Sequence, residues 1–240
     1  MSFETVTIGS ATLYRGDCME FMRGLPDNAF DLAIVDVPYG IGENGDRNAS
    51  RRKLAIAKDY KSFAGGDIEP PPVEYFSELQ RVSNNQIVWG ANHFMQNIGL
   101  GSPCWIVWDK LTGASDFADC ELAYTSFQTA VRKFTFQWSG MLQGDMKNKE
   151  ARIHPTQKPV KLYEWLLTNY AKPGDRILDT HGGSMSSVIA CLNMGFEVTC
   201  CEMDADYFSA GVDRVRNAQR QQPMFAPAPP KQVQTKLEEL

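Results

Sequence analysis

The sequence predicts an α/β fold built on a doubly wound, mostly parallel sheet. Short apolar runs typical of strands alternate with amphipathic stretches typical of helices. Two of these runs end in an aspartate, Asp36 and Asp179, directly before a loop. Open α/β sheets bind ligands where their strands give way to loops, so these two aspartates mark the candidate site.

The elements follow from the apolar periods and from the glycines and prolines between them. Residues 31–36 form the continuous apolar run of a strand buried on both faces. Asp17 is well placed to cap the helix that follows it, and three prolines open the second helix. The predicted helices cover residues 18–24, 70–81, 160–170, 186–194 and 204–220. The predicted strands cover residues 12–15, 31–36, 86–89, 104–108, 121–127, 133–138, 176–179 and 197–202.

Composition limits the class of protein. The chain has 240 residues, 43% of them hydrophobic, which is enough to bury the core of one domain. Its net charge of −5 gives no general attraction to nucleic acid, so a polyanion would have to meet a local basic patch. The six cysteines include no CxxC pair, so we expect no metal site and a reducing compartment. Since no signal peptide or long apolar stretch occurs, we expect a cytoplasmic protein without membrane contact.

The segment Asp36-Val37-Pro38-Tyr39 can bind an exocyclic amine. A carboxylate and a neighbouring carbonyl can accept both amine protons, which frees the nitrogen lone pair from the ring. Pro38 restricts Val37 to an extended conformation and so fixes the direction of the Val37 carbonyl. Tyr39 offers a flat face on which a flipped-out base can stack. Taken alone, the segment is also a common Asp-Pro turn.

Two further segments suit a nucleotide-like cofactor. Gly182 and Gly183 follow the second aspartate and allow the backbone to approach a ligand closely. Glu202 ends the next predicted strand roughly twenty residues later, where nucleotide-binding units place an acid on the ribose hydroxyls. Between the two aspartates, residues 154–159 (His-Pro-Thr-Gln-Lys-Pro) predict a rigid turn ahead of a helix. This turn can aim a hydroxyl and an ammonium at the amino-acid end of a cofactor.

These motifs resemble those of the beta-class DNA adenine-N6 methyltransferases. Residues 36–39 resemble their D-P-P-Y motif, and residues 154–159 resemble the block before their cofactor strand. Residues 179–187 resemble their D-P-F-x-G-S-G-T-T loop, and residues 16–20 resemble the segment before the amine site. The order, with the amine motif first and the cofactor motif second, is that of the beta class. The likeness covers roughly residues 12–217.

The resemblance implies a seven-stranded, Rossmann-like methyltransferase fold with its motifs in circularly permuted order. It implies transfer of a methyl group from S-adenosylmethionine to the N6 amine of a flipped-out adenine in a short site of double-stranded DNA. The catalytic residues would be Asp36, Val37, Pro38 and Tyr39. The cofactor would contact Asp17, Cys18, His154, Thr156, Lys158, Asp179, His181, Gly183, Ser184 and Glu202. A homodimer and a cognate restriction nuclease fit the class as partners, although the sequence shows no interface.

Within the cofactor group the resemblance divides the roles. Asp17 and the Cys18 backbone would bind the cofactor adenine, and Glu202 would bind the ribose. Asp179, Gly183 and Ser184 would contact the methionine part, and Thr156 and Lys158 would bind its carboxylate.

The sequence departs from the family pattern in three places. Val37 replaces a proline but keeps the carbonyl, so we expect this change to be tolerated. Thr180 and His181 replace Pro-Phe, which removes an aromatic ring near the methyl donor. Met185 replaces a glycine, so a left-handed backbone at this position would be strained.

We expect residues 1–222 to form the methyltransferase domain and residues 223–240 a Pro-rich disordered tail. A long mobile loop is predicted at 41–66 and a small target-recognition insertion at about 109–152. The basic residues that would contact DNA phosphates lie in the long loop: Arg47, Arg51, Arg52 and Lys53. The alternative for this loop is a solvated charged segment without a ligand.

Three other functions compete. A cytosine-N4 methyltransferase performs the same chemistry on another amine but usually carries Ser at the position of Asp36. A catalytically silent DNA-binding relative would keep the fold without binding cofactor. A nucleotide-dependent oxidoreductase is disfavoured because the full G-x-G-x-x-G pattern is missing.

Overall fold

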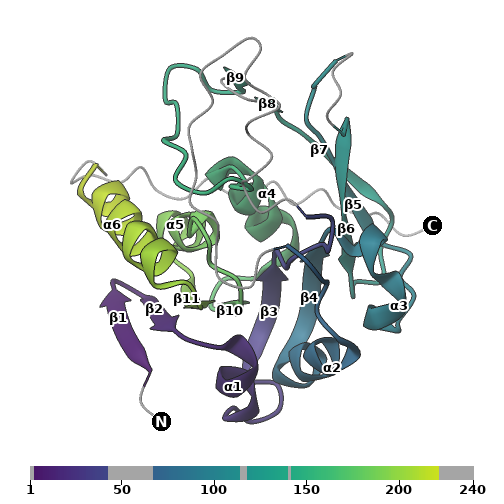
Figure 1. Ribbon diagram of the computed structural model, residues 1–240. Helices are drawn as coiled ribbons and strands as arrows, with labels where there is room; N and C mark the ends of the chain where they lie inside the picture. The colour runs from purple at the N-terminus through teal and green to yellow at the C-terminus, as the bar shows by residue number, and fades with distance from the viewer. Residues whose placement is uncertain (1–2, 43–66, 114–117, 140–141, 222–240) are drawn as a thin grey trace.

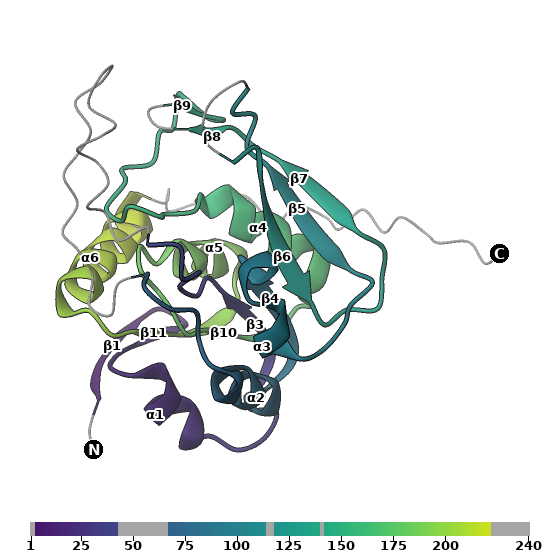
Figure 2. The ribbon, with the colours of Figure 1, turned by 45° about the vertical axis from the view of Figure 1, so that its right-hand side comes forward.

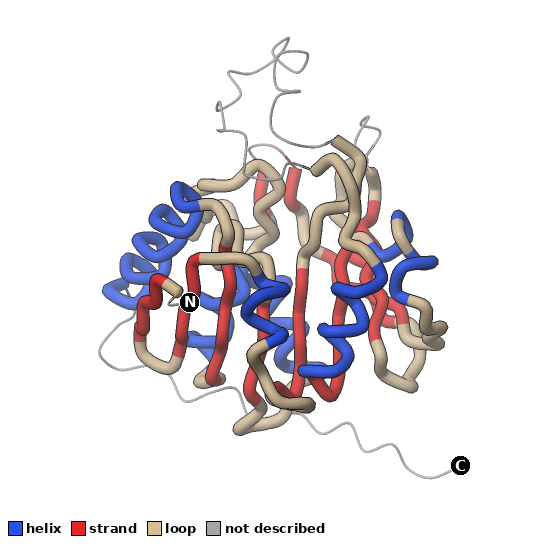
Figure 3. The backbone as a smooth tube through the Cα atoms, turned by 60° about the horizontal axis from the view of Figure 1, so that its bottom comes forward, coloured by secondary structure: helices blue, strands red, loops and turns tan. Residues whose placement is uncertain are grey.

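The computed structural model describes residues 3–42, 67–113, 118–139 and 142–221. In these residues a nine-stranded sheet forms the centre, and helices pack on both of its faces (Figures 1 and 3). The strand order is β1-β2-β11-β10-β3-β4-β6-β5-β7. A separate two-stranded hairpin, β8-β9, lies above the ends of β5 and β7 (Figure 2). The predicted α/β class is confirmed.

The elements have the following bounds. The strands of the large sheet are β1 (Glu4–Ile8), β2 (Ala11–Arg15), β3 (Phe30–Val35), β4 (Ser83–Trp89), β5 (Trp105–Asp109), β6 (Cys120–Thr125), β7 (Arg132–Thr135), β10 (Arg176–Asp179) and β11 (Glu197–Glu202). The hairpin consists of β8 (Trp138–Ser139) and β9 (Leu142–Gln143). The helices are α1 (Cys18–Arg23), α2 (Val73–Val82), α3 (Met95–Ile98), α4 (Val160–Tyr170), α5 (Ser186–Met194) and α6 (Ala205–Gln221), with a 3₁₀ turn, η2, at Ala91–His93. None of these described helices has the length and apolar character needed to cross a bilayer.

The direction of the strands decides where their ends lie. The five strands β2, β11, β10, β3 and β4 are all parallel, so their carboxyl ends share one edge of the sheet. β6 runs antiparallel to β4 and β5, and β1 runs antiparallel to β2. The sheet is therefore mostly parallel, as predicted. Within the described residues it has nine strands rather than seven, because β1 and β7 extend its two edges.

Side chains alternate along the central strands and fill two cores. Leu32 and Ile34 of β3 share one core with α4, α5 and α6. Ala33 and Val35 share the other core with α1, α2 and α3 on the opposite face (Figure 1). This confirms a strand buried on both faces. Each buried leucine, isoleucine or valine side chain stabilises the fold by about 1.5–3 kcal/mol.

Local signals set most element boundaries. The Asp17 side chain caps α1 by accepting hydrogen bonds from the backbone of Met19 (2.7 Å) and Glu20 (3.0 Å). α2 begins at Val73 rather than at residue 70. The backbone of Pro72 is extended, so the helix can begin only at the next residue. α4, β10, α5 and β11 have the predicted bounds. β1 lies outside the predicted strands because its side chains are mostly exposed and form no buried run.

Candidate active site

The sheet order brings the sequence-predicted segments together at one edge. β3 pairs with β10, so Asp36 and Asp179 lie at the ends of neighbouring strands although they are far apart in the sequence. β11 follows on the other side of β10 and ends at Glu202. β2 lies next to β11, and the backbone N–H of Gly16 donates to the Glu202 carbonyl at 3.0 Å. The amine segment (residues 36–39), the predicted cofactor loop (residues 179–187) and the Asp17 turn thus lie at the same edge of the sheet.

Asp36 lies in a compact hydrogen-bonded group with Tyr39 and Lys158. The Lys158 ammonium donates to Asp36 Oδ1 at 2.6 Å and to the Tyr39 hydroxyl at 2.9 Å. The Tyr39 hydroxyl in turn donates to the same Asp36 oxygen at 2.9 Å. The Lys158 side chain is 4% exposed and that of Asp36 is 17% exposed. Lys158 therefore contacts the amine segment, and its expected role at the cofactor carboxylate stays a prediction.

Two charged residues that the sequence did not single out complete this group. Glu121 of β6 lies 3.2 Å from the Lys158 ammonium through Oε2. Lys110, which follows β5, donates to Glu121 Oε1 at 3.1 Å. The signal in the sequence is a glutamate at the start of an otherwise apolar strand. Such a charge is costly to bury unless it is paired.

The charges of this group shift one another's pKa values. Burial raises the pKa of Asp36 above its usual value, although Lys158 opposes this. Burial by itself would lower the pKa of Lys158, but Asp36 and Glu121 raise it. Burial would raise the pKa of Glu121, but Lys158 and Lys110 lower it. Lys158 and Glu121 are therefore charged at neutral pH, and Asp36 is a stronger base than an exposed aspartate.

The Tyr39 ring lies over the end of β4. Gly90, at φ +71°, leaves room for it, because a Cβ there would lie 2.1 Å from Tyr39 Cε1. His93 stacks on the same ring with centroids 5.4 Å apart and an angle of 16° between the planes. Stacking of a target base on Tyr39 stays a prediction. Gly90 and His93 were absent from the sequence-predicted site because their approach to Tyr39 depends on the pairing of β3 with β4.

Asp67 fixes the backbone of the amine segment. Its side-chain Oδ1 accepts from the backbone N–H groups of Tyr39 (2.5 Å) and Gly40 (2.8 Å), and Oδ2 accepts from that of Ile41 (3.3 Å). Asp67 is 5% exposed. One buried carboxylate therefore holds three successive peptide groups directly after Pro38. The sequence alone did not indicate this role.

The loop after β10 is held by hydrogen bonds at both ends. Asp179 accepts from the His181 backbone at 3.0 Å and from the Ser187 hydroxyl. The backbone N–H of Gly183 donates to Glu202 Oε2 at 2.6 Å. At Gly182 a Cβ would lie 2.6 Å from Cys200 Sγ, so this position needs glycine for the loop to pack on β11. The loop is therefore preformed.

The turn at residues 154–157 lies over this loop. The Gln157 backbone donates to the His154 carbonyl at 3.2 Å, which closes the predicted turn. A Cβ at Gly183 would lie 3.7 Å from the His154 ring, and the Thr156 hydroxyl contacts His154 Nδ1 at 3.1 Å. The His154 ring also meets Tyr207 of α6, with centroids 4.4 Å apart. His154, Thr156 and Gly183 are thus brought together.

His181, which stands where the resembled motif has phenylalanine, has an uncharged ring. Its Nδ1 contacts the Thr180 hydroxyl at 2.9 Å, which in turn contacts the Tyr75 hydroxyl at 2.6 Å. The rings of Tyr75 and His181 meet edge to face at 5.5 Å. Burial lowers the pKa of His181 to about 4, so the ring is uncharged at neutral pH.

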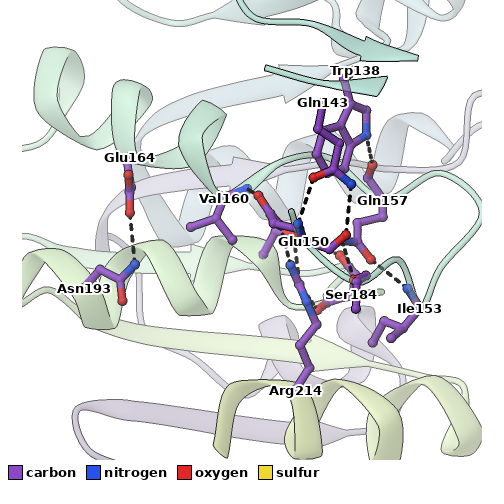
Figure 4. Close-up of polar contacts among 12 residues, drawn as sticks. Trp138, Gln143, Glu150, Ile153, Gln157, Val160, Glu164, Ser184, Asn193 and Arg214 are labelled. Carbon is purple, nitrogen blue, oxygen red and sulfur yellow. Dashed lines mark hydrogen bonds and ion pairs between the residues drawn. The ribbon is translucent and has the colours of Figure 1, made fainter. Parts of the chain in front are cut away.

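Met185 has the left-handed backbone that the sequence predicted to be strained, with φ at 57°. Arg214 of α6 supports it from outside: it donates to the Ser184 carbonyl at 2.6 Å and to Glu150 Oε2 at 2.7 Å (Figure 4). The other oxygen of Glu150 accepts from the Val160 backbone at 2.9 Å. α6, the start of α4 and the cofactor loop are therefore tied together.

The Asp17 turn borders the site from β2. Asp17 uses Oδ1 to cap α1, and Cys18 begins that helix. Burial, followed by the neighbouring Asp17 charge, raises the pKa of Cys18 to about 12, so its thiol is protonated. Contact of Asp17 and Cys18 with a cofactor stays a prediction. The predicted DNA-contacting residues Arg47, Arg51, Arg52 and Lys53, with most of the predicted loop 41–66, lie outside the described residues, as does the tail 223–240.

One family model and several known proteins match this chain. A family model described as DNA methylase matches residues 89–213, just over half of the chain. The type II methyltransferase M.HinfI of Haemophilus influenzae is 22% identical over an alignment of 252 residues. The alignment covers 85% of this chain and 68% of that protein. The crystal structure of the M1.HpyAVI-SAM complex matches with a TM-score of 0.53 at 19% identity, covering 85% of this chain and 99% of that one. The cytosine-N4-specific PvuII DNA methyltransferase matches with a TM-score of 0.57 at 12% identity, covering 91% and 94%.

Proposed function

We propose that this chain, which belongs to the DNA methylase family of N6- and N4-methyltransferases, methylates the N6 amine of adenine in DNA. Its methyl donor is S-adenosylmethionine. The observation that carries the adenine assignment is Asp36, a carboxylate rather than a hydroxyl at the tip of the strand that pairs with β10. It lies beside the loop that the family uses for its cofactor.

The chain's own residues account for the chemistry at the amine. The bound cofactor supplies an electrophilic methyl group on a sulfonium centre. Asp36 and the Val37 carbonyl accept hydrogen bonds from the two N–H groups of the amine, which makes the nitrogen pyramidal and frees its lone pair for attack. Once the nitrogen has gained the methyl group, it carries one proton too many. Asp36, whose pKa is raised by burial, is the base in place to accept that proton.

The residues around the loop fit the cofactor. The two oxygens of Glu202 each accept one backbone N–H, from Gly183 at 2.6 Å and Asp204 at 2.8 Å, and each keeps a lone pair for a ribose hydroxyl. The neutral His181 ring gives an uncharged surface beside a sulfonium. The backbone of Gly183 and Ser184 would meet the methionine part.

The decisive experiment identifies the methylated nucleoside. DNA incubated with the protein and S-adenosylmethionine is digested, and the products are separated and identified. N6-methyladenosine supports the proposal, whereas N4-methylcytosine would assign the reaction to the competing cytosine enzyme. Absence of both, together with no calorimetric binding of the cofactor, would identify a silent relative.

Two substitutions separate the amine site from the cofactor site. Asp36→Ala should abolish methyl transfer while cofactor binding persists, because its carboxylate touches the target amine. Glu202→Ala should weaken cofactor binding first, because its carboxylate holds the loop and the ribose. Glu197→Ala, at the exposed opposite end of β11, is the matched control and should change neither. If both site variants stayed active, the assignment of residues would be wrong.

DNA binding is tested through charge. Phosphate contacts release counterions, so the logarithm of affinity falls with the logarithm of salt by about 0.9 per contact. Replacing Arg51, Arg52 and Lys53 together by Ala should flatten this dependence. An unchanged slope would remove these residues from the DNA interface.

A further inference from the structure

We infer that Glu121 is a positioning residue of the amine site: it holds the Lys158 ammonium on one oxygen of Asp36 and leaves the other oxygen for the target amine. The inference rests on the proposed function, because it takes Asp36 as the group that binds the amine. Glu121 belongs to β6, outside every motif that the sequence singled out. Its role follows from contacts made across the sheet.

Four charged groups of alternating sign form a chain that ends at Asp36. Lys110 donates to Glu121 at 3.1 Å, Glu121 lies 3.2 Å from Lys158, and Lys158 donates to Asp36 at 2.6 Å. Their side chains are between 4% and 24% exposed. Two positive and two negative charges cancel, which allows the chain to be buried. It begins in the β5–β6 hairpin and ends at the tip of β3.

The Lys158 ammonium donates to Asp36 Oδ1 and to the Tyr39 hydroxyl at 2.9 Å, and it forms an ion pair with Glu121 Oε2 at 3.2 Å. Two of these three partners belong to the amine segment. The geometry therefore makes Lys158 part of the amine site.

The contacts of this charged group also determine which oxygen of Asp36 remains free for the substrate. Lys158 and Tyr39 both donate to Oδ1. Within the described part of the chain, no group donates to Oδ2. The carboxylate is thus held in one orientation, and its second oxygen is left to accept a proton of the target amine. Without Glu121, the Lys158 ammonium would lose its second carboxylate partner.

The charges around Lys158 and Asp36 predict how activity depends on pH. Transfer needs Asp36 ionised and Lys158 protonated, so their pKa values set the acidic and alkaline limits of the rate. Removing the Glu121 charge lowers both pKa values, because it removes a like charge from Asp36 and an opposite charge from Lys158. Removing the Lys110 charge should raise the pKa values of both Asp36 and Lys158. Among the described residues, the titratable groups Tyr39, Tyr163, His154 and Asp179 also interact with this pair.

The test compares Glu121→Gln, Lys110→Met and the control Glu164→Gln, a glutamate on α4 that pairs with the exposed Lys161. For Glu121→Gln we expect a kcat roughly tenfold to a hundredfold lower, the cost of a misplaced reacting group. Its cofactor Kd should change by less than about twofold, since Glu121 does not touch the cofactor loop. The whole pH–rate profile should move to lower pH in Glu121→Gln and to higher pH in Lys110→Met. Glu164→Gln should leave the profile unchanged.

The outcomes are distinguishable. A wild-type protein that methylates neither base overturns the proposed function. The interaction between Glu121 and Lys158 can then still be tested in the free protein. NMR titration of the Lys158 ammonium should show a lower pKa in Glu121→Gln than in the wild type. If the wild type is active but both variants shift the profile equally or not at all, Glu121 has no positioning role. If Glu121→Gln fails to fold, the test rests on Lys110→Met, whose pH–rate profile should move to higher pH.

Discussion

The side chain of Met185 occupies the space that Gly211 leaves open on α6. A Cβ at Gly211 would lie 2.8 Å from Met185 Sδ and 2.9 Å from its Cγ. Met185 is completely buried, and its backbone is left-handed with φ at 57° and ψ at 33°. A glycine would be expected at such a backbone, since a bulky residue there costs about 1–3 kcal/mol. Packing against α6 offsets this strain.

Gly211→Ala should therefore destabilise the protein. Alanine in a helix is ordinarily about 1 kcal/mol better than glycine, so an open position would gain stability. Here the added methyl group meets Met185, and overpacking of this kind costs about 1–3 kcal/mol. Denaturant unfolding measures the difference, with Ser209→Ala on the exposed face of α6 as the control. A stabilised Gly211→Ala variant would contradict the described contact.

Asp179 should make stability depend on pH. Burial raises its pKa to about 7, above the ordinary value of 3.8, in spite of its hydrogen bonds. The folded state therefore binds a proton that the unfolded state has lost, and stability falls as the pH rises from about 4 to about 7. The loss is about 4 kcal/mol at most. In Asp179→Asn this part of the slope should disappear, as measured by unfolding without cofactor, whereas the exposed Asp213→Asn should keep it.

Asp67→Ala should loosen the amine segment. Its carboxylate accepts from three successive backbone N–H groups, and each hydrogen bond to a charged group contributes about 1.5–3 kcal/mol. We expect a loss of stability in this range or above it, together with a lower kcat. Cofactor affinity should be retained, because the Asp67 carboxylate binds the backbone of residues 39–41 in the amine segment. Asp145→Ala, which removes an exposed turn aspartate, is the control, and an equal effect of both variants would contradict the prediction.

Arg214→Lys should weaken cofactor binding. Lysine keeps the charge but cannot reach both Glu150 and the Ser184 carbonyl as the guanidinium does. The loop that carries Ser184 would lose one charged hydrogen bond, and we expect the cofactor Kd to rise by about tenfold. Calorimetry measures this, with the exposed Arg216→Lys on the same helix as the control. Equal affinities in both variants would show that Arg214 acts only on folding.

Much of the site could be predicted because its parts are local in sequence. A carboxylate that directly follows an apolar strand, as at Asp36 and Asp179, lies at a strand end in almost any α/β arrangement. The cap at Asp17 and the turn at His154 depend on residues two or three positions away. The strain at Met185 was also predictable, because it is a property of one residue and its backbone.

The partners of these residues could not be predicted in the same way. Glu121, Asp67 and Gly90 contact the amine segment from other strands and loops, and no short spacing in the sequence connects them to Asp36. Lys158 was recognised by its motif, but the motif said nothing about which carboxylates would surround it. Its contacts depend on the distance between β3 and β6 in the folded sheet.

The sequence by itself predicted most of the strands and helices in their order along the chain, the residues at the strand ends and the family, since these depend on apolar periods and on neighbours along the chain. The tertiary structure alone decided that Lys158 lies on Asp36, that Glu121 holds it there, and that α6 supports the loop at Ser184. The reason is physical: buried charges must be paired with whatever the sheet order brings near them, and that order is a property of the whole chain.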